Sequence, residues 1–397
     1  MRVRSERIVT PAGTVTGEVL IDGARIRAIG AITTGGEVID VGSRWLAPGC
    51  IDAHVHGGAG AQCNSADPGE IAEVARFHAT HGTTAMLATT VAAAPDELCT
   101  ALETIAGLTR PARPAGLTAP APRRDGAEVL GAHLEGPFLS RGRAGAMDPA
   151  SFSEPDPTVV ERLLGSGAGT VRMMTLAPEL PGSMELIAKL IDRNVVVSVG
   201  HSDASYEQVR AAVAAGVRSA THVFNAMRPL HHREPGLLGA ALDLPEISCE
   251  LICDGIHVSA PAMRIAYRVK GAAGIRLVTD AMQAAGMPEG EYRLGSARVR
   301  VSEGRATLVD GDSLAGSTLT MDQAMRGAVR MLGLTVEEAI VLACANPARL
   351  LDLQDRKGSI APGLDADLIV LDDALRCCAT MVGGEWVYGD PQDRGDA

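Results

Sequence analysis

The 397-residue sequence is short of basic charge, of aromatic side chains and of long apolar runs. Lysine and arginine number 36 against 48 acidic residues, which gives a formal net charge of −12. A chain with this balance lacks the basic face that nucleic acid or an anionic membrane surface requires, so neither is an expected partner. No segment approaches the ~20 consecutive apolar residues of a membrane span, and no signal-peptide run follows the first residues. We therefore expect a cytosolic protein.

Paired cysteine motifs are missing as well. Eight cysteines are spread from Cys50 to Cys378 without a Cys-x-x-Cys pair, so we expect small buried thiols and no disulfides. Apolar material is abundant instead. Hydrophobic residues make up 46% of the chain and charged residues 21%, which indicates a globular protein with a large core.

Short apolar segments alternate with stretches of helical spacing along most of the chain. Apolar residues three and four apart predict helices over 67–78 and 183–193, and the Pro- and Gly-rich residues 107–126 predict a surface loop. Eight alternating units of this kind close into a (β/α)8 barrel of TIM type, which we assign to residues 48–350. The predicted barrel strands are residues 50–56, 83–90, 129–136, 171–178, 195–201, 219–225, 247–254 and 275–280.

Both ends of the chain show a β pattern. Residues 1–47 contain short alternating segments separated by Gly and Asp turns, and residues 351–397 repeat this pattern at 364–371 and 381–388. Neither end can bury a face alone, so we expect the two to pack together as one small β-sandwich domain beside the barrel. Residues 290–312 predict an added hairpin after the eighth strand.

Polar residues stand near the ends of several predicted barrel strands, the face at which such barrels carry their active sites. Two of them, His54 and His56, are two apart on one strand, so both imidazoles point to the same side. A His-x-His pair alone would fit a structural role, but polar residues at five predicted strand ends, those of the first, third, fifth, sixth and eighth strands, favour metal catalysis. A carboxylate with histidines gives the mixed ligand set of a hydrolytic zinc site. The candidate ligands are His54, His56, Glu135, His201 and His222.

Asp280 ends the eighth predicted strand. A carboxylate beside a metal-activated water can take the proton of that water and return it to the leaving nitrogen, so Asp280 is the candidate general acid–base. The alternative interpretation is that Asp280 is another metal ligand. Both interpretations place it in the site. His133, two residues before Glu135, is interpreted as structural or as a residue that supports the metal ligands.

Several motifs resemble those of one enzyme family, in the same order along the chain. Residues 48–56, with the sequence PGCIDAHVH, resemble the opening signature of the amidohydrolase superfamily. This resemblance extends to the motifs of N-acetylglucosamine-6-phosphate deacetylases, and it implies release of acetate from N-acetylglucosamine 6-phosphate in amino-sugar catabolism and cell-wall recycling. The matching segments are 133–138, 200–204, 221–227, 233–236, 254–258, 279–281 and 314–317.

The resemblance also implies roles for individual residues. Glu135, His201 and His222 would hold the principal divalent ion, with Zn²⁺ expected and Fe²⁺ as the alternative. Some relatives replace His-x-His by Gln-x-Asn and keep one ion, so the retained His54 and His56 leave the number of ions open. A homodimer is expected. The implied substrate-binding residues are Ala146, Met147, Asn225, Ala226, Arg233, Asp254, His257, Leu314, Ala315 and Gly316.

Two of these substrate-binding residues carry specific expectations. Arg233, together with the Asn225–Ala226 backbone, would receive the phosphate, since arginine forms forked charge-assisted pairs that an acidic protein needs locally. Met147 stands where relatives commonly have a histidine that contacts the substrate, and a methionine cannot donate that hydrogen bond. The preference among N-acetylhexosamine 6-phosphates therefore stays open.

Two alternative functions share the predicted fold. A cyclic amidase such as a dihydroorotase or hydantoinase-like enzyme commonly bridges two metals with a carboxylated lysine on the fourth strand, but residues 171–178 contain no lysine. A non-catalytic scaffold on the same barrel should have lost metal ligands, and all five are present. Both alternatives are therefore less favoured than the deacetylase.

Overall fold

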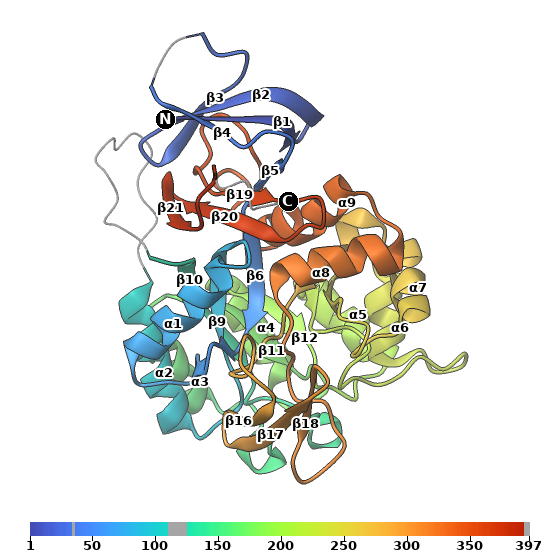
Figure 1. The fold of residues 1–397 in the computed structure, drawn as a ribbon. Coiled ribbons are helices and arrows are strands. Elements are labelled where there is room, and N and C mark those ends of the chain that lie inside the picture. The colour runs from blue at the N-terminus through green and yellow to red at the C-terminus, as the bar shows by residue number, and fades with distance from the viewer. Residues whose placement is uncertain (34–35, 110–124, 393–397) are drawn as a thin grey trace.

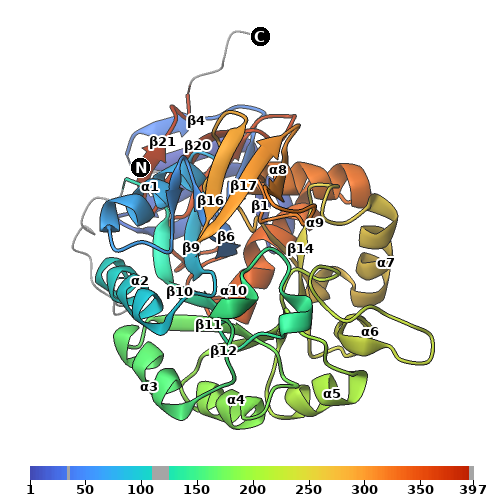
Figure 2. The ribbon, with the colours of Figure 1, turned by 90° about the horizontal axis from the view of Figure 1, so that it is seen from below.

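The computed structural model describes residues 1–33, 36–109 and 125–392, so most of the predicted loop at 107–126 lies outside the described residues. Its centre is a sheet of eight parallel strands that follow one another in chain order (Figures 1 and 2). The last strand returns to the first, where His56 N donates to Ala281 O at 2.8 Å and Asp280 N donates to His54 O at 2.9 Å. The strands are β6 (Cys50–Val55), β9 (Thr83–Thr90), β10 (Glu128–Glu135), β11 (Val171–Leu176), β12 (Val196–Val199), β13 (Ser219–Ala220), β14 (Ser248–Ile252) and β15 (Ile275–Val278).

Helices surround this sheet, as the view along the barrel in Figure 2 shows, except the last of them, which packs against residues inside the barrel. The predicted helices are present as α1 and α4, and α1 begins where Asp67 accepts a hydrogen bond from Gly69 N at 2.8 Å. The predicted (β/α)8 barrel is therefore confirmed. Its helices are α1 (Pro68–Ala79), α2 (Pro95–Leu108), α3 (Pro157–Ser166), α4 (Ser183–Asp192), α5 (Tyr206–Ala214), α6 (Gly236–Asp243), α7 (Ala260–Lys270), α8 (Met321–Gly327), α9 (Val336–Ile340) and α10 (Asn346–Leu350).

The two ends of the chain build one small β domain, as predicted. Its strands β5 and β19 pair antiparallel, with Leu46 opposite Val370, so the first and last parts of the chain share a core. All eight strands belong to one connected hydrogen-bonded sheet. They are β1 (Arg2–Thr10), β2 (Gly13–Asp22), β3 (Arg25–Gly30), β4 (Val38–Asp40), β5 (Trp45–Pro48), β19 (Leu368–Leu371), β20 (Cys377–Val382) and β21 (Glu385–Tyr388).

Gly49 alone joins this domain to the barrel on the N-terminal side. Strand β5 ends at Pro48 and β6 begins at Cys50. A Cβ atom at Gly49 would collide with the side chain of Thr84 in β9, so a glycine lets the chain pass directly from one sheet into the other. The small domain therefore lies at the N-terminal ends of the barrel strands.

A third sheet lies at the opposite end of the barrel (Figure 1). The predicted hairpin at 290–312 is present and gains a third strand, giving β16 (Gly290–Leu294), β17 (Ala297–Ser302) and β18 (Arg305–Leu308). Its apolar side chains pack against Val91 and Met282, which follow β9 and β15. The C-terminal ends of the barrel strands are thus the ones that this sheet adjoins. No helix of the described residues has the length and apolar character needed to cross a membrane.

Candidate active site and metal centre

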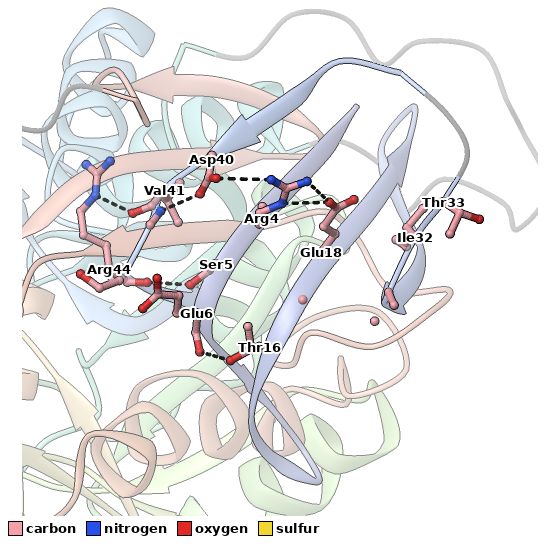
Figure 3. A pocket seen from close by; sticks show the side chains of 15 residues that line it. Arg4, Ser5, Glu6, Thr16, Glu18, Ile32, Thr33, Asp40, Val41 and Arg44 are labelled. Carbon is pink, nitrogen blue, oxygen red and sulfur yellow. Dashed lines mark hydrogen bonds and ion pairs between the residues drawn. The ribbon is translucent and has the colours of Figure 1, made fainter.

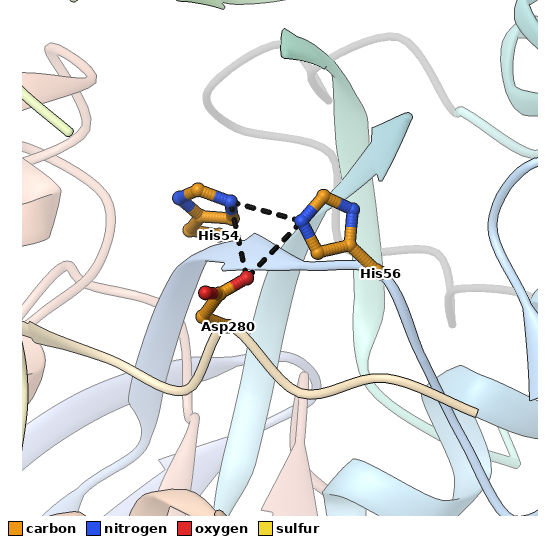
Figure 4. A group of neighbouring side chains, drawn as sticks. All are labelled: His54, His56 and Asp280. Atoms are coloured by element: carbon orange, nitrogen blue, oxygen red, sulfur yellow. Dashed lines mark hydrogen bonds and ion pairs between the residues drawn. The ribbon is translucent and has the colours of Figure 1, made fainter. Parts of the chain in front are cut away.

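Six polar side chains meet inside the barrel at the C-terminal ends of its strands. All six are buried, and their nitrogen and oxygen atoms fall into two groups, in each of which these atoms lie within 4.8 Å of one another. We refer to His54, His56 and Asp280 as the first group, shown in Figure 4, and to Glu135, His201 and His222 as the second group. The structure therefore brings together every metal-ligand candidate and the candidate catalytic residue.

In the first group, Nε2 of His54 lies 3.1 Å from Nε2 of His56. Oδ1 of Asp280 lies 3.1 Å from the same His56 nitrogen and 3.5 Å from that of His54. Figure 4 shows the three side chains turned toward one common point. The carboxylate of Asp280 thus stands within the group, at a position compatible with proton transfer and with coordination.

In the second group, Nε2 of His201 lies 3.0 Å from Nε2 of His222. Oε1 of Glu135 lies 3.2 Å from the His201 nitrogen and 3.0 Å from the His222 nitrogen. The other oxygen of Glu135, Oε2, lies 3.3 Å from Nε2 of His56 in the first group. One carboxylate therefore contacts both groups.

Four of the six residues lie beyond their strands, and one of them, His56, directly follows β6. His201, His222 and Asp280 each follow by two residues the end of β12, β13 or β15, so these strands are shorter than predicted. Their φ angles are 45°, 28° and 51°, in the left-handed region that residues with a Cβ rarely adopt. Such a conformation interrupts the strand ladder and costs on the order of 1–3 kcal/mol per residue. The strain coincides with the candidate ligands, which is typical of a functional site.

The outer ring nitrogens of three histidines face oxygen atoms. Since an oxygen of this kind accepts a hydrogen bond, each Nδ1 carries a hydrogen, and each ring, once neutral, presents the lone pair of Nε2 to its group. Lone pairs that converge with a carboxylate oxygen require a cation between them, so the donor set fits a divalent metal ion. The contacts are His54 Nδ1 to Glu250 Oε2 at 2.9 Å, His56 Nδ1 to Thr89 O at 3.2 Å, and His201 Nδ1 to Arg143 O at 2.9 Å.

The charges of the two groups compensate each other. Burial lowers the pKa of His56, but Asp280 and Glu135 outweigh burial and raise this pKa to about 9. Burial raises the pKa of Glu135, but His54 and His201 hold it well below its usual range. The proton that His56 carries in the metal-free protein is one that a bound ion would displace.

Sequence reasoning missed two buried charged residues next to the site. Glu250 in β14 and Arg276 in β15 are both fully buried, and Glu250 Oε1 accepts a hydrogen bond from Arg276 Nη2 at 3.1 Å. Burial raises the pKa of Glu250, but His54 and Arg276 together hold it well below its usual range. The signal in the sequence is an acidic residue inside an apolar strand, the same signal that singles out Glu135.

The predicted substrate-binding residues beside His201 and His222 lie on two segments. Asn225 Nδ2 donates to His222 O at 3.2 Å, and the neighbouring Ala226 O accepts from Ser202 N at 3.2 Å. Ala146 and Met147 are half-buried in the loop after the short helix η1 (Arg141–Arg143), the helix whose last carbonyl contacts His201. These four residues therefore lie on segments that touch the second group.

Other predicted substrate-binding residues lie near the ends of β14 and β15. His257 Nδ1 lies 2.6 Å from Asp254 Oδ2 in the turn after β14, and the two form a partly buried pair. Leu314, Ala315 and Gly316 precede Ser317, whose backbone N donates to Asp280 O at 2.7 Å. The segment 314–316 is thereby held against the first group.

Arg233 is the predicted residue that the structure does not bring to the two groups. It is exposed on the loop before α6, where its Nη1 lies 2.7 Å from His232 Nε2. With Arg143 and Arg228 it lines a cavity of about 490 Å³, and Arg143 is the residue whose carbonyl oxygen contacts His201. Arg233 thus belongs to an arginine-lined cavity adjoining the second group.

A larger cavity, of about 790 Å³, lies in the small β domain (Figure 3). Three of its charged residues pair with one another, since Arg4 lies 2.7 Å from Glu18 and 3.5 Å from Asp40. None of the predicted site residues is among the described residues that line it. The chemistry of the two groups is therefore separate from this cavity.

Comparison with known proteins assigns the chain to a family. The amidohydrolase family model matches residues 45–387. An N-acetylglucosamine-6-phosphate deacetylase of Lysinibacillus sphaericus is 41% identical, covering 88% of this chain and 87% of that protein. An N-acetylgalactosamine-6-phosphate deacetylase of Escherichia coli O157:H7 is 37% identical, covering 96% of this chain and 98% of that protein.

A solved structure agrees with these relatives. It shows a variant of the N-acetyl-D-glucosamine-6-phosphate deacetylase of Mycobacterium smegmatis in complex with N-acetyl-D-glucosamine-6-phosphate. That protein is 38% identical, with a TM-score of 0.90 over 98% of this chain and 99% of that chain. The chain therefore belongs to the metal-dependent amidohydrolase family and, within it, to the N-acetylglucosamine-6-phosphate deacetylases.

Proposed function

We propose that this protein hydrolyses N-acetylglucosamine 6-phosphate to glucosamine 6-phosphate and acetate, and that it does so in the cytosol. The observation that carries the proposal is the convergence of four histidines and two carboxylates at the C-terminal ends of the barrel strands, in a chain whose relatives are named for this reaction. An amide is a poor electrophile and its nitrogen a poor leaving group. The site must therefore activate water and also protonate the nitrogen.

The donor set supports one or two divalent ions, for which we propose Zn²⁺, with Fe²⁺ as the alternative. Glu135, His201 and His222 would hold the principal ion, while His54 and His56 offer a second position. A bound ion supplies Lewis-acid chemistry, lowering the pKa of a water to about 7 and polarising the amide carbonyl.

Asp280 moves the proton in this proposal. Its carboxylate accepts a proton from the attacking water as the water oxygen bonds to the amide carbon. It then delivers this proton to the nitrogen as the carbon–nitrogen bond breaks, leaving acetate and a primary amine. Two backbone hydrogen bonds support this placement, since Asp280 N donates to His54 O at 2.9 Å and Asp280 O accepts from Ser317 N at 2.7 Å.

The phosphate is proposed to bind Arg233 and the Asn225–Ala226 backbone. In the arginine-lined cavity, Arg143 pairs with Asp203 at 2.7 Å and Arg228 pairs with Glu234 at 2.6 Å. Arg233 contacts the neutral acceptor His232 instead of a carboxylate, so its positive charge is available to a ligand.

We also propose a homodimer with the mouth of the active site near the interface. Sedimentation that shows a monomer at working concentration would contradict the dimer.

Acetate release from a panel of sugars tests the function. The panel contains N-acetylglucosamine, N-acetylgalactosamine and N-acetylmannosamine, each with and without a 6-phosphate. The second candidate substrate is N-acetylgalactosamine 6-phosphate, favoured by the Escherichia coli relative, which matches 96% of this chain. We expect the highest kcat/KM on N-acetylglucosamine 6-phosphate. Equal activity on phosphorylated and unphosphorylated sugars would contradict the proposal.

A substitution tests the role of Arg233. Arg233→Ala should lower kcat/KM on the phosphorylated sugar by roughly 10²-fold, the effect of losing a charged hydrogen-bond partner, and leave activity on the unphosphorylated sugar unchanged. Arg210→Ala is the matched control, because Arg210 is exposed on α5 and pairs with Glu207. The same loss on both sugars would contradict a phosphate role.

A further inference from the structure

A buried ion pair lies inside the barrel beneath the two groups. Glu250 in β14 and Arg276 in β15 both have 0% exposed surface, and they come from neighbouring strands. Placing two charges in the interior is costly, and a pair that only stabilises the fold can often be replaced by apolar residues without loss. The contacts of Glu250 point to a further role.

One oxygen of Glu250 contacts a residue from each group. Oε2 lies 2.9 Å from Nδ1 of His54, and it accepts a hydrogen bond from the backbone N of His222 at 3.0 Å. The first contact holds the proton of the His54 ring on Nδ1, so that Nε2 faces the first group. The second contact holds the backbone of His222, whose φ of 28° is strained, beside the second group.

Arg276 fixes the position of Glu250. Its Nη1 donates to Ser248 O at 2.8 Å, and its Nη2 donates to Glu250 and to the hydroxyl of Ser219. The Ser219 hydroxyl continues into a chain of buried hydroxyls, in which Ser198 bonds to Ser219 and to Thr221 at 2.7 Å each. Hydrogen bonds from both terminal nitrogens therefore hold the Arg276 guanidinium in place. The guanidinium in turn fixes the position of the Glu250 carboxylate.

We propose that Glu250, held in place by Arg276, is a positioning residue that sets the His54 ring and the His222 backbone together. This inference rests on the metal-dependent chemistry of the proposed function but not on the identity of the sugar. Glu135 contacts both groups through their ligand atoms, whereas Glu250 contacts the outer nitrogen of the His54 ring and the backbone nitrogen of His222. Removing Glu250 should therefore weaken metal binding at both groups, although Glu250 belongs to neither group of candidate ligands.

A double substitution tests this role without leaving an unpaired buried charge. Glu250→Gln with Arg276→Met removes both charges and nearly preserves side-chain volume. The matched control is Glu128→Gln with Lys357→Met. It removes a buried ion pair at the other end of the barrel, in which Lys357 Nζ lies 2.8 Å from Glu128 Oε2. Each protein is prepared metal-free. Zn²⁺ affinity is measured by competition with a chelator, and the visible spectrum is recorded with Co²⁺.

The site variant should bind Zn²⁺ roughly 10- to 100-fold more weakly and show a changed Co²⁺ spectrum. The control should keep the affinity and spectrum of the wild type, even if its melting temperature falls. Glu250→Gln alone, which keeps one acceptor oxygen, should lie between the wild type and the double variant and is used if the double variant does not fold. Wild-type affinity and spectrum in either Glu250 variant would overturn the inference.

The measurement also separates this inference from the proposed function. If the wild type binds metal and Glu250 variants weaken binding, but no sugar of the panel releases acetate, the inference stands and the deacetylase proposal fails. If acetate is released and the Glu250 variants bind metal normally, the deacetylase proposal stands and the inference about Glu250 fails. A wild type that binds neither Zn²⁺ nor Co²⁺ would overturn both.

Discussion

Strand β10 carries a buried glutamate at each end, and the two are neutralised in different ways. Glu128, at the start, contacts Arg356 and lies 2.8 Å from Lys357 Nζ. Glu135, at the end, contacts four histidines, at distances between 3.0 and 3.5 Å. We refer to Glu128, Arg356, Lys357, Asp365 and Asp367 as the basal cluster.

The chemistry of the partners explains the difference between the two ends. Lys357 and Arg356 are permanent cations with donors and no lone pair, so the basal cluster is complete without a ligand. Histidines are weak bases whose Nε2 atoms accept either a proton or a metal ion. A buried carboxylate therefore marks a functional site when its neighbours can exchange their positive charge, and a structural one when they cannot.

The largest effect that would test this comparison is on turnover. Asp280→Asn should lower kcat by about 10²- to 10⁴-fold, the usual contribution of general acid–base catalysis, while bound metal is largely retained. Asp367→Asn in the basal cluster should change the free energy of unfolding and leave kcat unchanged. Acetate release and metal content of the purified proteins check both.

Glu135→Gln serves as the contrast to Asp280→Asn, because it should lose metal and activity together. If Asp280→Asn keeps a kcat within about tenfold of the wild type, Asp280 is not the acid–base. If it loses metal as Glu135→Gln does, Asp280 acts mainly as a ligand.

The next largest effect is on stability. Lys357→Met should lower the free energy of unfolding by about 3–5 kcal/mol, because it leaves buried carboxylates with one cation fewer. Its side chain is 2% exposed, so water cannot compensate. Denaturant unfolding measures the change, and Zn²⁺ affinity should stay that of the wild type. A loss of metal affinity would show that the two ends of the barrel are coupled.

The free energy of unfolding of the metal-free protein, measured as a function of pH, should separate the two ends further. The pKa of His56 is about 9 in the folded protein, against roughly 6.5 in the unfolded chain. The folded state binds this proton more tightly, so its stabilisation is complete below pH 6.5 and is lost as the pH rises through 9. The loss should be on the order of 3 kcal/mol.

Two controls accompany this titration. The Zn²⁺-loaded protein should lack the decrease, since the ion replaces the proton, and His56→Asn should flatten it. The basal cluster should not contribute, because its carboxylates raise the pKa of Lys357 despite burial and keep it charged throughout this range. An equally steep decrease in His56→Asn would contradict the assignment to His56.

The smallest effect on stability is expected from a substitution in an exposed cluster of charges. Glu291 pairs with Arg298 at 2.9 Å and with Arg300 at 3.0 Å on the β16–β18 sheet, where all three side chains are exposed. Glu291→Gln should leave the midpoint of urea unfolding unchanged, because solvent screens such pairs. A shift as large as that of Lys357→Met would show that pairing, and not burial, makes the basal cluster important.

Local patterns in the sequence were sufficient for the barrel and for the six polar residues of the site. Apolar runs predict strands, and polar residues directly after such runs predict the C-terminal face, so His54 and Glu135 could be placed. The left-handed conformations of His201 and His222 could not be predicted, because they depend on neighbouring strands. These conformations end β12 and β13 earlier than the apolar runs suggest.

Pairs distant in the sequence were also beyond prediction. Glu250 and Arg276 are 26 residues apart, and only the parallel register of β14 and β15 places them opposite each other. The packing of the two chain ends was predicted, but the pairing of β5 with β19 was not. The phosphate role of Arg233 stays a prediction; its loop places it in the arginine-lined cavity and not at the two groups, and no local signal gives the path of a loop.

The shared small domain has a consequence for the order in which the protein is made. Strand β5 leaves the ribosome early, but its partner β19 begins at Leu368. At about 5–20 residues per second, synthesis of the intervening chain takes roughly 15–60 s. During that time Leu46 and its neighbours lack the part of their native core that β19 and β20 supply. The nascent chain should thus need protection at its oldest segment, and truncation before β19 should leave that part of the core permanently uncovered.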